Sequence, residues 1–297
     1  MSDRQFSPPQ KPAPDDIRPA RTAALVHLLG DDDPKIASVA WEELERLGDF
    51  VLSAVEEAGE RSEDHRVRTQ TRRFLTEWSR REVFREWVEF CRSDARSLEK
   101  GVFLIARSEY PKIEVSQYEE LLNEHAYEIR QKLRVVRTNG EAVRELSRFL
   151  FETVGYTGNE DSYYDPDNSY LNRVLDRRTG IPISLAVVFL LVARRLSITV
   201  HGVNMPKQFL LKYREPRGDV FIDVFRSGRM MSTRECAEFL QASGVSFQES
   251  HLKAIPPRKI LRRLLGNLLR VYLTREDARR SRRLNAMLEV LGDPPAS

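Results

Sequence analysis

Apolar positions in the first third of the chain recur at three- and four-residue spacing, which is typical of amphipathic helices. Asp33 and Pro34 supply an N-capping carboxylate and a proline for the first helical turn, and Gly48 ends the pattern. We therefore predict a helical hairpin here, at the start of a helical segment over residues 21–95. The apolar stripe of its central helix consists of Ile36, Val39, Ala40, Leu44 and Leu47.

This leucine-rich hairpin, with its aspartate and proline turn, resembles a HEAT-type helical repeat. One repeat is a weak signal, because such solenoids need about three units for stability. The alternative is a set of helices that pack on the main core. Residues 61–100 interleave aromatic side chains with arginines. That pattern fits stacking on nucleic acid, or a core-facing aromatic stripe with a solvated charged face, and we expect the second.

The middle of the chain contains a helix that is apolar on every side. We predict it from Ser184 to Leu196, and residues 185–193 are all apolar. A helix of this kind is buried around its whole circumference. Three segments rich in β-branched and aromatic residues follow it, and a proline and a glycine mark a turn between the last two. They are Ile198–Asn204, Gln208–Tyr213 and Val220–Phe225.

These elements predict an α+β fold that is mainly helical, with a buried central helix beside an antiparallel sheet. Two further helices are expected at residues 98–106 and 115–135. After the proline pair at 256 and 257, two amphipathic helices close the chain. Residues 258–283 hold ten Lys or Arg against two Asp or Glu, and we expect a solvated helical face there rather than a nucleic-acid site.

Composition narrows the class of protein. The 48 basic and 45 acidic residues nearly cancel, so net charge gives no support to nucleic-acid binding. Cys91 and Cys236 are too far apart in sequence for a disulfide framework or a zinc motif. No apolar run is long enough to span a membrane, and no secretory signal is visible. We expect a soluble cytoplasmic protein without a cofactor, with a disordered proline-rich tail at residues 1–20.

Three features carry a resemblance: the stretch NSYLNRVLDRRTGIPISL at 168–185, the apolar helix after it, and the strand entry GVNMPxxFLL that leads to FIDVF at 221–225. They resemble the SirB-type, transglutaminase-like proteins of bacteria. The C-terminal sequence ILRRLLGNLLRVYLTRED is similar to the tetratricopeptide-like hairpin that often ends that family. The expected domains are a tail at 1–20, a HEAT-like segment at 21–95, the SirB-type domain at 96–255 and the hairpin at 256–297.

The resemblance implies a papain-like or transglutaminase-like core. In its catalytic relatives a cysteine begins the buried helix, a histidine on the next strand activates it, and an aspartate orients the histidine. The matching positions here are Ser184, Gln208 and Asp223. The SirB-type family usually reads Pro-Gly-His-Phe around the histidine, and this chain reads Pro-Lys-Gln-Phe at residues 206–209.

A serine nucleophile needs a general base, and a glutamine amide has no usable basicity near neutral pH. We therefore expect Ser184 to be the N-cap of the central helix, and no catalytic residues. His201 is the nearest histidine in sequence to the mapped strand, but we expect neither it nor another histidine to act as the base. No two histidines share metal-ligand spacing, so no metal site is expected.

The polar groups around the former cleft are either ligand-binding residues or local caps. Asn168 and Ser169, in particular, are suited to capping the helix that starts near Leu171. The leading hypothesis is a non-catalytic binding or regulatory protein whose partner is a protein or peptide. The alternative is a weak peptidase or transglutaminase that acts through Ser184. The candidate cleft residues are Asn168, Ser169, Asn172, Ser184, Gln208 and Asp223.

Overall fold

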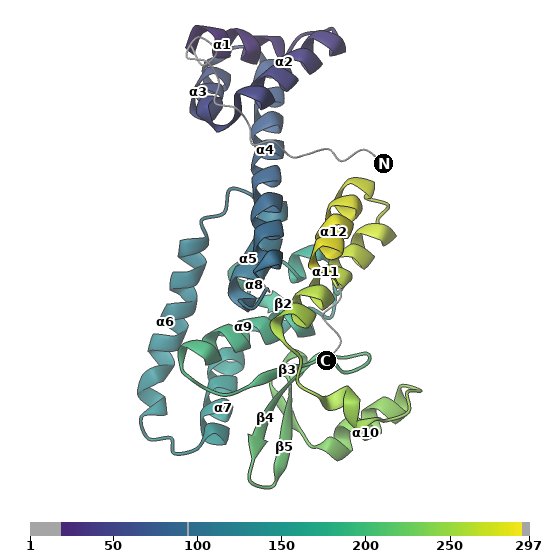
Figure 1. The fold of residues 1–297 in the computed structure, drawn as a ribbon. Coiled ribbons are helices and arrows are strands. Elements are labelled where there is room, and N and C mark those ends of the chain that lie inside the picture. The colour runs from purple at the N-terminus through teal and green to yellow at the C-terminus, as the bar shows by residue number, and fades with distance from the viewer. Residues whose placement is uncertain (1–18, 94, 293–297) are drawn as a thin grey trace. The chain divides into compact units, whose positions relative to one another are not determined.

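The computed structural model describes residues 19–93 and 95–292 (Figure 1). Its contacts divide the chain into two compact units, residues 1–82 and 83–297. The long helix α4 (His65–Arg92) contributes its beginning to the first unit and its end to the second. The predicted tail at 1–20 lies outside the described residues, except for its last two, which begin a helix.

The first unit packs short helices against the beginning of α4. The Asp33 side chain accepts a hydrogen bond from the Lys35 amide at 2.9 Å, and Pro34 begins the second helix. Gly48 ends that helix with a φ of +72°, a conformation that favours glycine. The apolar core includes Leu44 and Trp78. The helices are α1 (Pro19–Leu28), α2 (Pro34–Leu47) and α3 (Leu52–Arg61).

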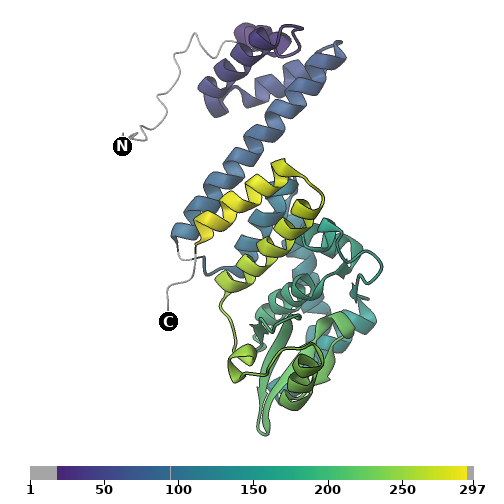
Figure 2. The same ribbon diagram turned by 90° about the vertical axis from the view of Figure 1, so that its right-hand side faces the viewer.

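The second unit holds the larger core and most of the helices (Figure 2). Two predicted helices are confirmed, one from Leu98 and one from Val115, with Pro111 between them. In chain order the helices after α4 are α5 (Leu98–Glu109), α6 (Val115–Leu133), α7 (Asn139–Arg148), α8 (Leu171–Arg177), α9 (Pro182–Arg195), α10 (Thr233–Ala242), α11 (Pro257–Thr274) and α12 (Ala278–Leu291).

A four-stranded antiparallel sheet in the order β3-β4-β5-β6 follows α9. Pro216 and Arg217 form the turn between β4 and β5, since Glu215 pairs with Gly218. The first predicted strand, Ile198–Asn204, is shortened at both ends, and the predictions missed β6 and a short parallel pair. The strands are β1 (Thr157–Gly158), β2 (Thr179–Gly180), β3 (His201–Val203), β4 (Leu210–Glu215), β5 (Gly218–Asp223) and β6 (Arg229–Met231).

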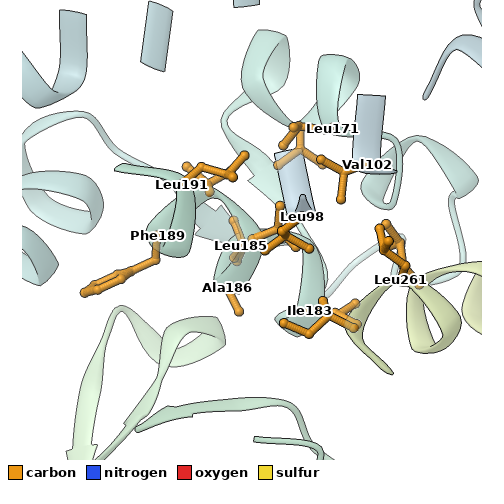
Figure 3. Close-up of a cluster of buried hydrophobic side chains, with 14 of the residues drawn as sticks. Leu98, Val102, Leu171, Ile183, Leu185, Ala186, Phe189, Leu191 and Leu261 are labelled. Atoms are coloured by element: carbon orange, nitrogen blue, oxygen red, sulfur yellow. The ribbon is translucent and has the colours of Figure 1, made fainter. Parts of the chain in front are cut away.

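Helix α9 lies at the centre of this unit (Figure 3). It contacts α5, α6, α7, α8 and α11 as well as strands β3 and β4. Phe189 is fully buried, and Val187 and Leu191 are each 1% exposed. The prediction of a mainly helical α+β core around a buried helix is confirmed. At the end of α9, the buried carboxylate of Glu99 pairs with Arg194 and Arg195, each at 2.5 Å.

The two C-terminal helices pack on each other and on the core. Leu261 of α11 lies against Gly101 of α5, where a Cβ atom would come within 2.4 Å of a leucine methyl group. The Trp87 indole donates a hydrogen bond to the Met287 carbonyl at 3.0 Å, which ties α4 to α12. Within residues 19–93 and 95–292, no helix is long and apolar enough to cross a membrane.

Candidate functional site

Gln208 and Asp223 meet at one end of the sheet, because Gln208 precedes β4 and Asp223 ends the paired strand β5. The Gln208 Nε2 atom donates a hydrogen bond to Asp223 Oδ2 at 2.5 Å. Asp223 is 1% exposed, and its Oδ1 accepts the amides of Phe225 at 3.1 Å and Arg226 at 3.3 Å. The glutamine thus occupies the place beside the buried carboxylate that the resemblance gives to a histidine.

Ser184 lies at the third position of α9, so the prediction that it is the N-cap is wrong. The helix begins at Pro182, whose fixed φ and missing amide suit the first helical position, and Ile181 is the N-cap. The Ser184 Oγ atom accepts the Ile181 amide at 3.0 Å and lies 2.5 Å from the Asn168 carbonyl oxygen. Ser184 is 2% exposed, and its hydroxyl hydrogen-bonds main-chain groups.

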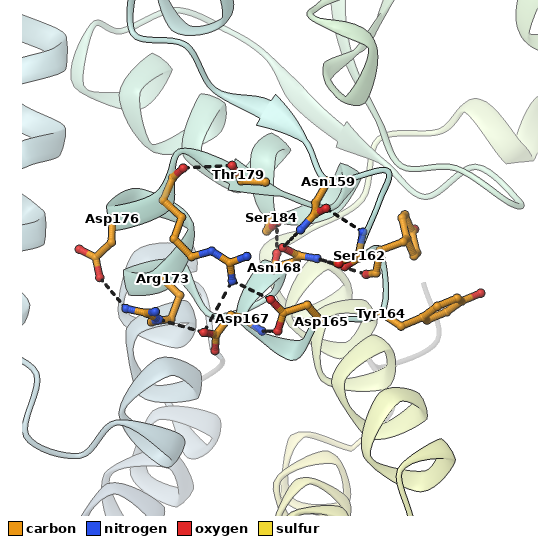
Figure 4. Close-up of polar contacts among 12 residues, drawn as sticks. Asn159, Ser162, Tyr164, Asp165, Asp167, Asn168, Arg173, Asp176, Thr179 and Ser184 are labelled. Carbon is orange, nitrogen blue, oxygen red and sulfur yellow. Dashed lines mark hydrogen bonds and ion pairs between the residues drawn. The ribbon is translucent and has the colours of Figure 1, made fainter.

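Asn168 organises the loop before α8 (Figure 4). Its Nδ2 donates to the Ser162 carbonyl at 2.8 Å, and its Oδ1 accepts from Asn159 Nδ2 at 3.0 Å. The expected capping of α8 by Asn168 and Ser169 is wrong. Pro166 starts a short 3₁₀ turn that holds Asn168 inside the loop, and Tyr170 becomes the N-cap of α8 without a side-chain hydrogen bond.

Two ion pairs fix the outer side of this loop. Arg177 donates to Asp165 at 2.8 Å, and Arg173 donates to Asp167 at 3.1 Å (Figure 4). Partial burial alone would raise the pKa of Asp165. The hydrogen bonds from Arg177 and from the Asp167 amide outweigh it, so the pKa lies below its ordinary value. Asp165 therefore stays ionised and neutralised by Arg177.

The six candidate cleft residues form separate groups. Gln208 contacts Asp223, and Ser184 contacts the Asn168 main chain. In the described part of the chain, no hydrogen bond joins Ser184 to Gln208 or Asp223. Asn172 is 2% exposed on α8, and its Oδ1 has no hydrogen-bond partner among the described residues.

Two histidines of the second unit, His201 and His125, make other contacts. His201 is exposed on β3, opposite Lys212. His125 is buried on α6, with Nε2 at 3.2 Å from the Tyr156 hydroxyl, and burial lowers its pKa. Neither forms a hydrogen bond with Ser184 or Gln208 in the described ranges.

A cavity of about 600 Å³ lies between the loop before α8 and helix α11. Ser169 is the one candidate cleft residue in its lining. Ile181, which hydrogen-bonds Ser184, lines it as well. The complete lining consists of Tyr163, Tyr164, Asp165, Ser169, Ile181, Lys207, Arg263, Gly266, Asn267, Arg270 and Val271.

Sequence reasoning missed the cations of this cavity, Lys207, Arg263 and Arg270. Two of them, Arg263 and Arg270, belong to the basic run 258–283, for which the sequence pattern predicts a solvated face. The third, Lys207, is visible in the sequence as a departure from the family motif, because lysine stands at the glycine of Pro-Gly-His-Phe. Lys207 has a φ of +68°, a conformation that favours glycine, the residue that the resemblance has at this position.

Comparisons with known proteins agree with this fold. The profile of the transglutaminase-like superfamily matches residues 116–266. The match includes α9 and the whole sheet, and it ends within α11. No solved structure gives a significant match.

Several curated proteins are similar to parts of the chain. A UPF0162 protein of Xylella fastidiosa is 39% identical over 175 residues, which are 57% of this chain and 62% of that protein. A UPF0162 protein of Pseudomonas aeruginosa is 39% identical over 121 residues, 40% of this chain and 44% of the other. F-box only protein 21 of Mus musculus is 31% identical over 142 residues, 45% of this chain and 22% of its own length. The chain thus spans less than two thirds of the length of these relatives.

Proposed function

Because the chain belongs to the transglutaminase-like superfamily, we propose that it is a non-catalytic member, a binding or regulatory protein of the SirB type. One observation carries the proposal. The side chain beside the buried Asp223 carboxylate is the amide of Gln208, which donates a hydrogen bond to it and cannot take up a proton near neutral pH.

The state of Ser184 supports the same conclusion. A serine nucleophile needs its hydroxyl hydrogen-bonded to a base, and this hydroxyl is engaged with the Ile181 amide and the Asn168 carbonyl. Main-chain carbonyl oxygens are not proton acceptors for catalysis. The hydroxyl therefore serves to hold the start of α9 against the loop before α8.

The flanking helices suit a protein partner. We assign residues 21–95 to a HEAT-like segment and residues 256–297 to a tetratricopeptide-like hairpin, on either side of a SirB-type domain at 96–255. Repeat-like helices of these kinds present extended surfaces to proteins and peptides. The part of F-box only protein 21 that is similar to this chain is 22% of that protein. This is consistent with a core that can be joined to other segments in one chain. We also propose that the protein is bacterial and cytoplasmic. Both cysteines are free and buried, which is consistent with a reducing compartment.

Restoring the missing groups tests the site mapping. In the double variant Ser184→Cys, Gln208→His, an imidazole beside Asp223 should stabilise the thiolate at residue 184. We expect its alkylation by iodoacetamide at neutral pH to be about tenfold faster than in Ser184→Cys alone. Ser184→Cys with Gln208→Ala is the matched control and should show no increase. Equal rates in all three variants would mean that the mapped side chains do not converge.

The native cysteines give a slow internal reference in the same experiment. Burial raises the pKa of Cys91 to about 11 and, with the charges of Glu235 and Asp223, that of Cys236 to about 12. Peptide mass spectrometry then separates the three sites. The wild-type protein should neither react with fluorophosphonate probes at Ser184 nor transfer amines to glutamine peptides. Labelling at Ser184 would make the protein an enzyme and would refute the proposal.

A further inference from the structure

The cavity beside the former active site has the size of a small-ligand site. Its volume of about 600 Å³ falls within the range of roughly 300–1,000 Å³ that is usual for small-molecule pockets. One wall is the loop with Tyr163 and Tyr164, and the opposite wall is α11 around Gly266. In Figure 4 the ring of Tyr164 points away from the asparagine and aspartate contacts of its loop.

Three cations of this cavity lack a carboxylate partner among the described residues. Arg263 donates to the Asn204 side chain at 2.6 Å, a neutral amide that orients the guanidinium. Lys207 and Arg270 have no side-chain hydrogen bond or ion pair there. The one acid in the lining, Asp165, is neutralised by Arg177. The cavity therefore holds an excess of positive charge.

Other arginines of the same helical hairpin are arranged differently. Arg280 lies 2.6 Å from the Glu109 carboxylate, and Arg283 pairs with the same group. Arg258 and Arg262 donate to main-chain carbonyls. Carboxylates thus neutralise Arg280 and Arg283 on α12, whereas no carboxylate neutralises the cations at the cavity among the described residues.

This concentration of positive charge is electrostatically unfavourable. Burial and, to a smaller extent, the neighbouring charge of Arg270 act to lower the pKa of the Arg263 guanidinium below its ordinary value. Lys207 stands in a left-handed backbone conformation that is unfavourable for a non-glycine residue. A ligand that binds these side chains would explain why both unfavourable features are present. An anionic ligand would also reduce the electrostatic repulsion between the cations.

The charge count favours a phosphate group over a single carboxylate. Two guanidinium groups and one ammonium group match the two negative charges and several acceptor oxygens of a phosphate monoester. The rings of Tyr163 and Tyr164 offer apolar surface to the rest of such a molecule.

We propose that this cavity binds a small molecule through its phosphate group, with Lys207, Arg263 and Arg270 as the phosphate-binding residues. The site goes beyond the partner binding proposed above, and it does not depend on whether Ser184 is reactive.

Isothermal titration of the full chain with pyrophosphate, a compact probe with the required chemistry, tests the site. The wild type should bind with a midpoint at millimolar concentration or below, more weakly as salt rises. Arg270→Gln and Lys207→Gln, both at exposed positions, should each lower the affinity about tenfold through loss of a charge-assisted hydrogen bond. The matched control Arg282→Gln, at an exposed position on α12, should bind as the wild type does.

Three results would overturn the proposal. They are no heat of binding with the wild type, equal affinity in Arg270→Gln and wild type, or an equal loss in Arg282→Gln. A hexaglutamate peptide is titrated in parallel. If the peptide binds more tightly than pyrophosphate and loses affinity in the same variants, the cavity takes an acidic protein segment and the phosphate proposal is wrong.

Discussion

Single side chains decide what this core can do. The hydrogen bond from Gln208 keeps the Asp223 carboxylate buried and satisfied, as an imidazole would, but offers no proton acceptor. The sequence was sufficient to predict the lack of a basic group at residue 208, because that depends on residue type alone, but the hydrogen bond to Asp223 is visible only in the structure. The sequence was not sufficient to predict that Ser184 lies two residues inside its helix. That position results from Pro182, which takes the first helical position.

The buried imidazole of His125 should make the protein less stable in mild acid. Burial lowers its pKa in the folded state, while the unfolded chain keeps the ordinary value of 6.5. As pH falls through 6.5, the unfolded chain takes up a proton that the folded chain does not, so the free energy of unfolding decreases. For one proton, the free energy of unfolding can decrease by at most about 1.4 kcal/mol per pH unit.

Urea unfolding at about pH 7.5 and about pH 5.5 measures this effect. This pH range spans the ordinary pKa of histidine and lies above that of most carboxylates, whose titration would otherwise also change the stability. His125→Gln should reduce the loss of stability between the two values. His201→Gln, at an exposed position, should not change it. An unchanged pH dependence in His125→Gln would show that the pKa of His125 is the same in the folded and the unfolded protein.

Helix α9 is the element that most of the core contacts. Phe189→Ala should lower the free energy of unfolding by about 3–5 kcal/mol, because it leaves a cavity among fully buried neighbours. Leu273→Ala on α11 is the matched control. Leu273 is 58% exposed, so its replacement should change the free energy of unfolding by no more than about 0.5 kcal/mol in the same urea titration. A similar small effect of Phe189→Ala would contradict the central position of α9.

The elements differ in how far the sequence predicted them. Helix α9 was evident from its unbroken apolar run, and the β4–β5 hairpin from Pro216 in its turn and Gly218 directly after it. The strands β1, β2 and β6 are two or three residues long, so no alternating pattern could mark them. The cavity was also hidden, because its residues come from segments about a hundred positions apart that only the folded chain brings together.

At the scale of the whole second unit, the C-terminal hairpin completes the core and cannot be removed without loss. Leu261, Leu265 and Leu268 of α11 are fully buried. Deletion of residues 258–297 should therefore lower the melting temperature or make the protein insoluble, as followed by circular dichroism. Leu261→Ala gives a milder test, with an expected loss of about 2–5 kcal/mol. An unchanged melting temperature after the deletion would mean that the core is stable without the hairpin.

The two edges of the sheet have a consequence for the behaviour of the protein at high concentration. On the outer side of β3, Val203 forms a bridge with Ala254, and the Ile255 amide donates to the Gly202 carbonyl at 2.9 Å. On the other edge, β6 is three residues long and begins with Arg229, which pairs with Glu235. Short, charged or covered edges give a neighbouring chain little backbone to pair with, so this sheet is protected against the strand addition that starts aggregation.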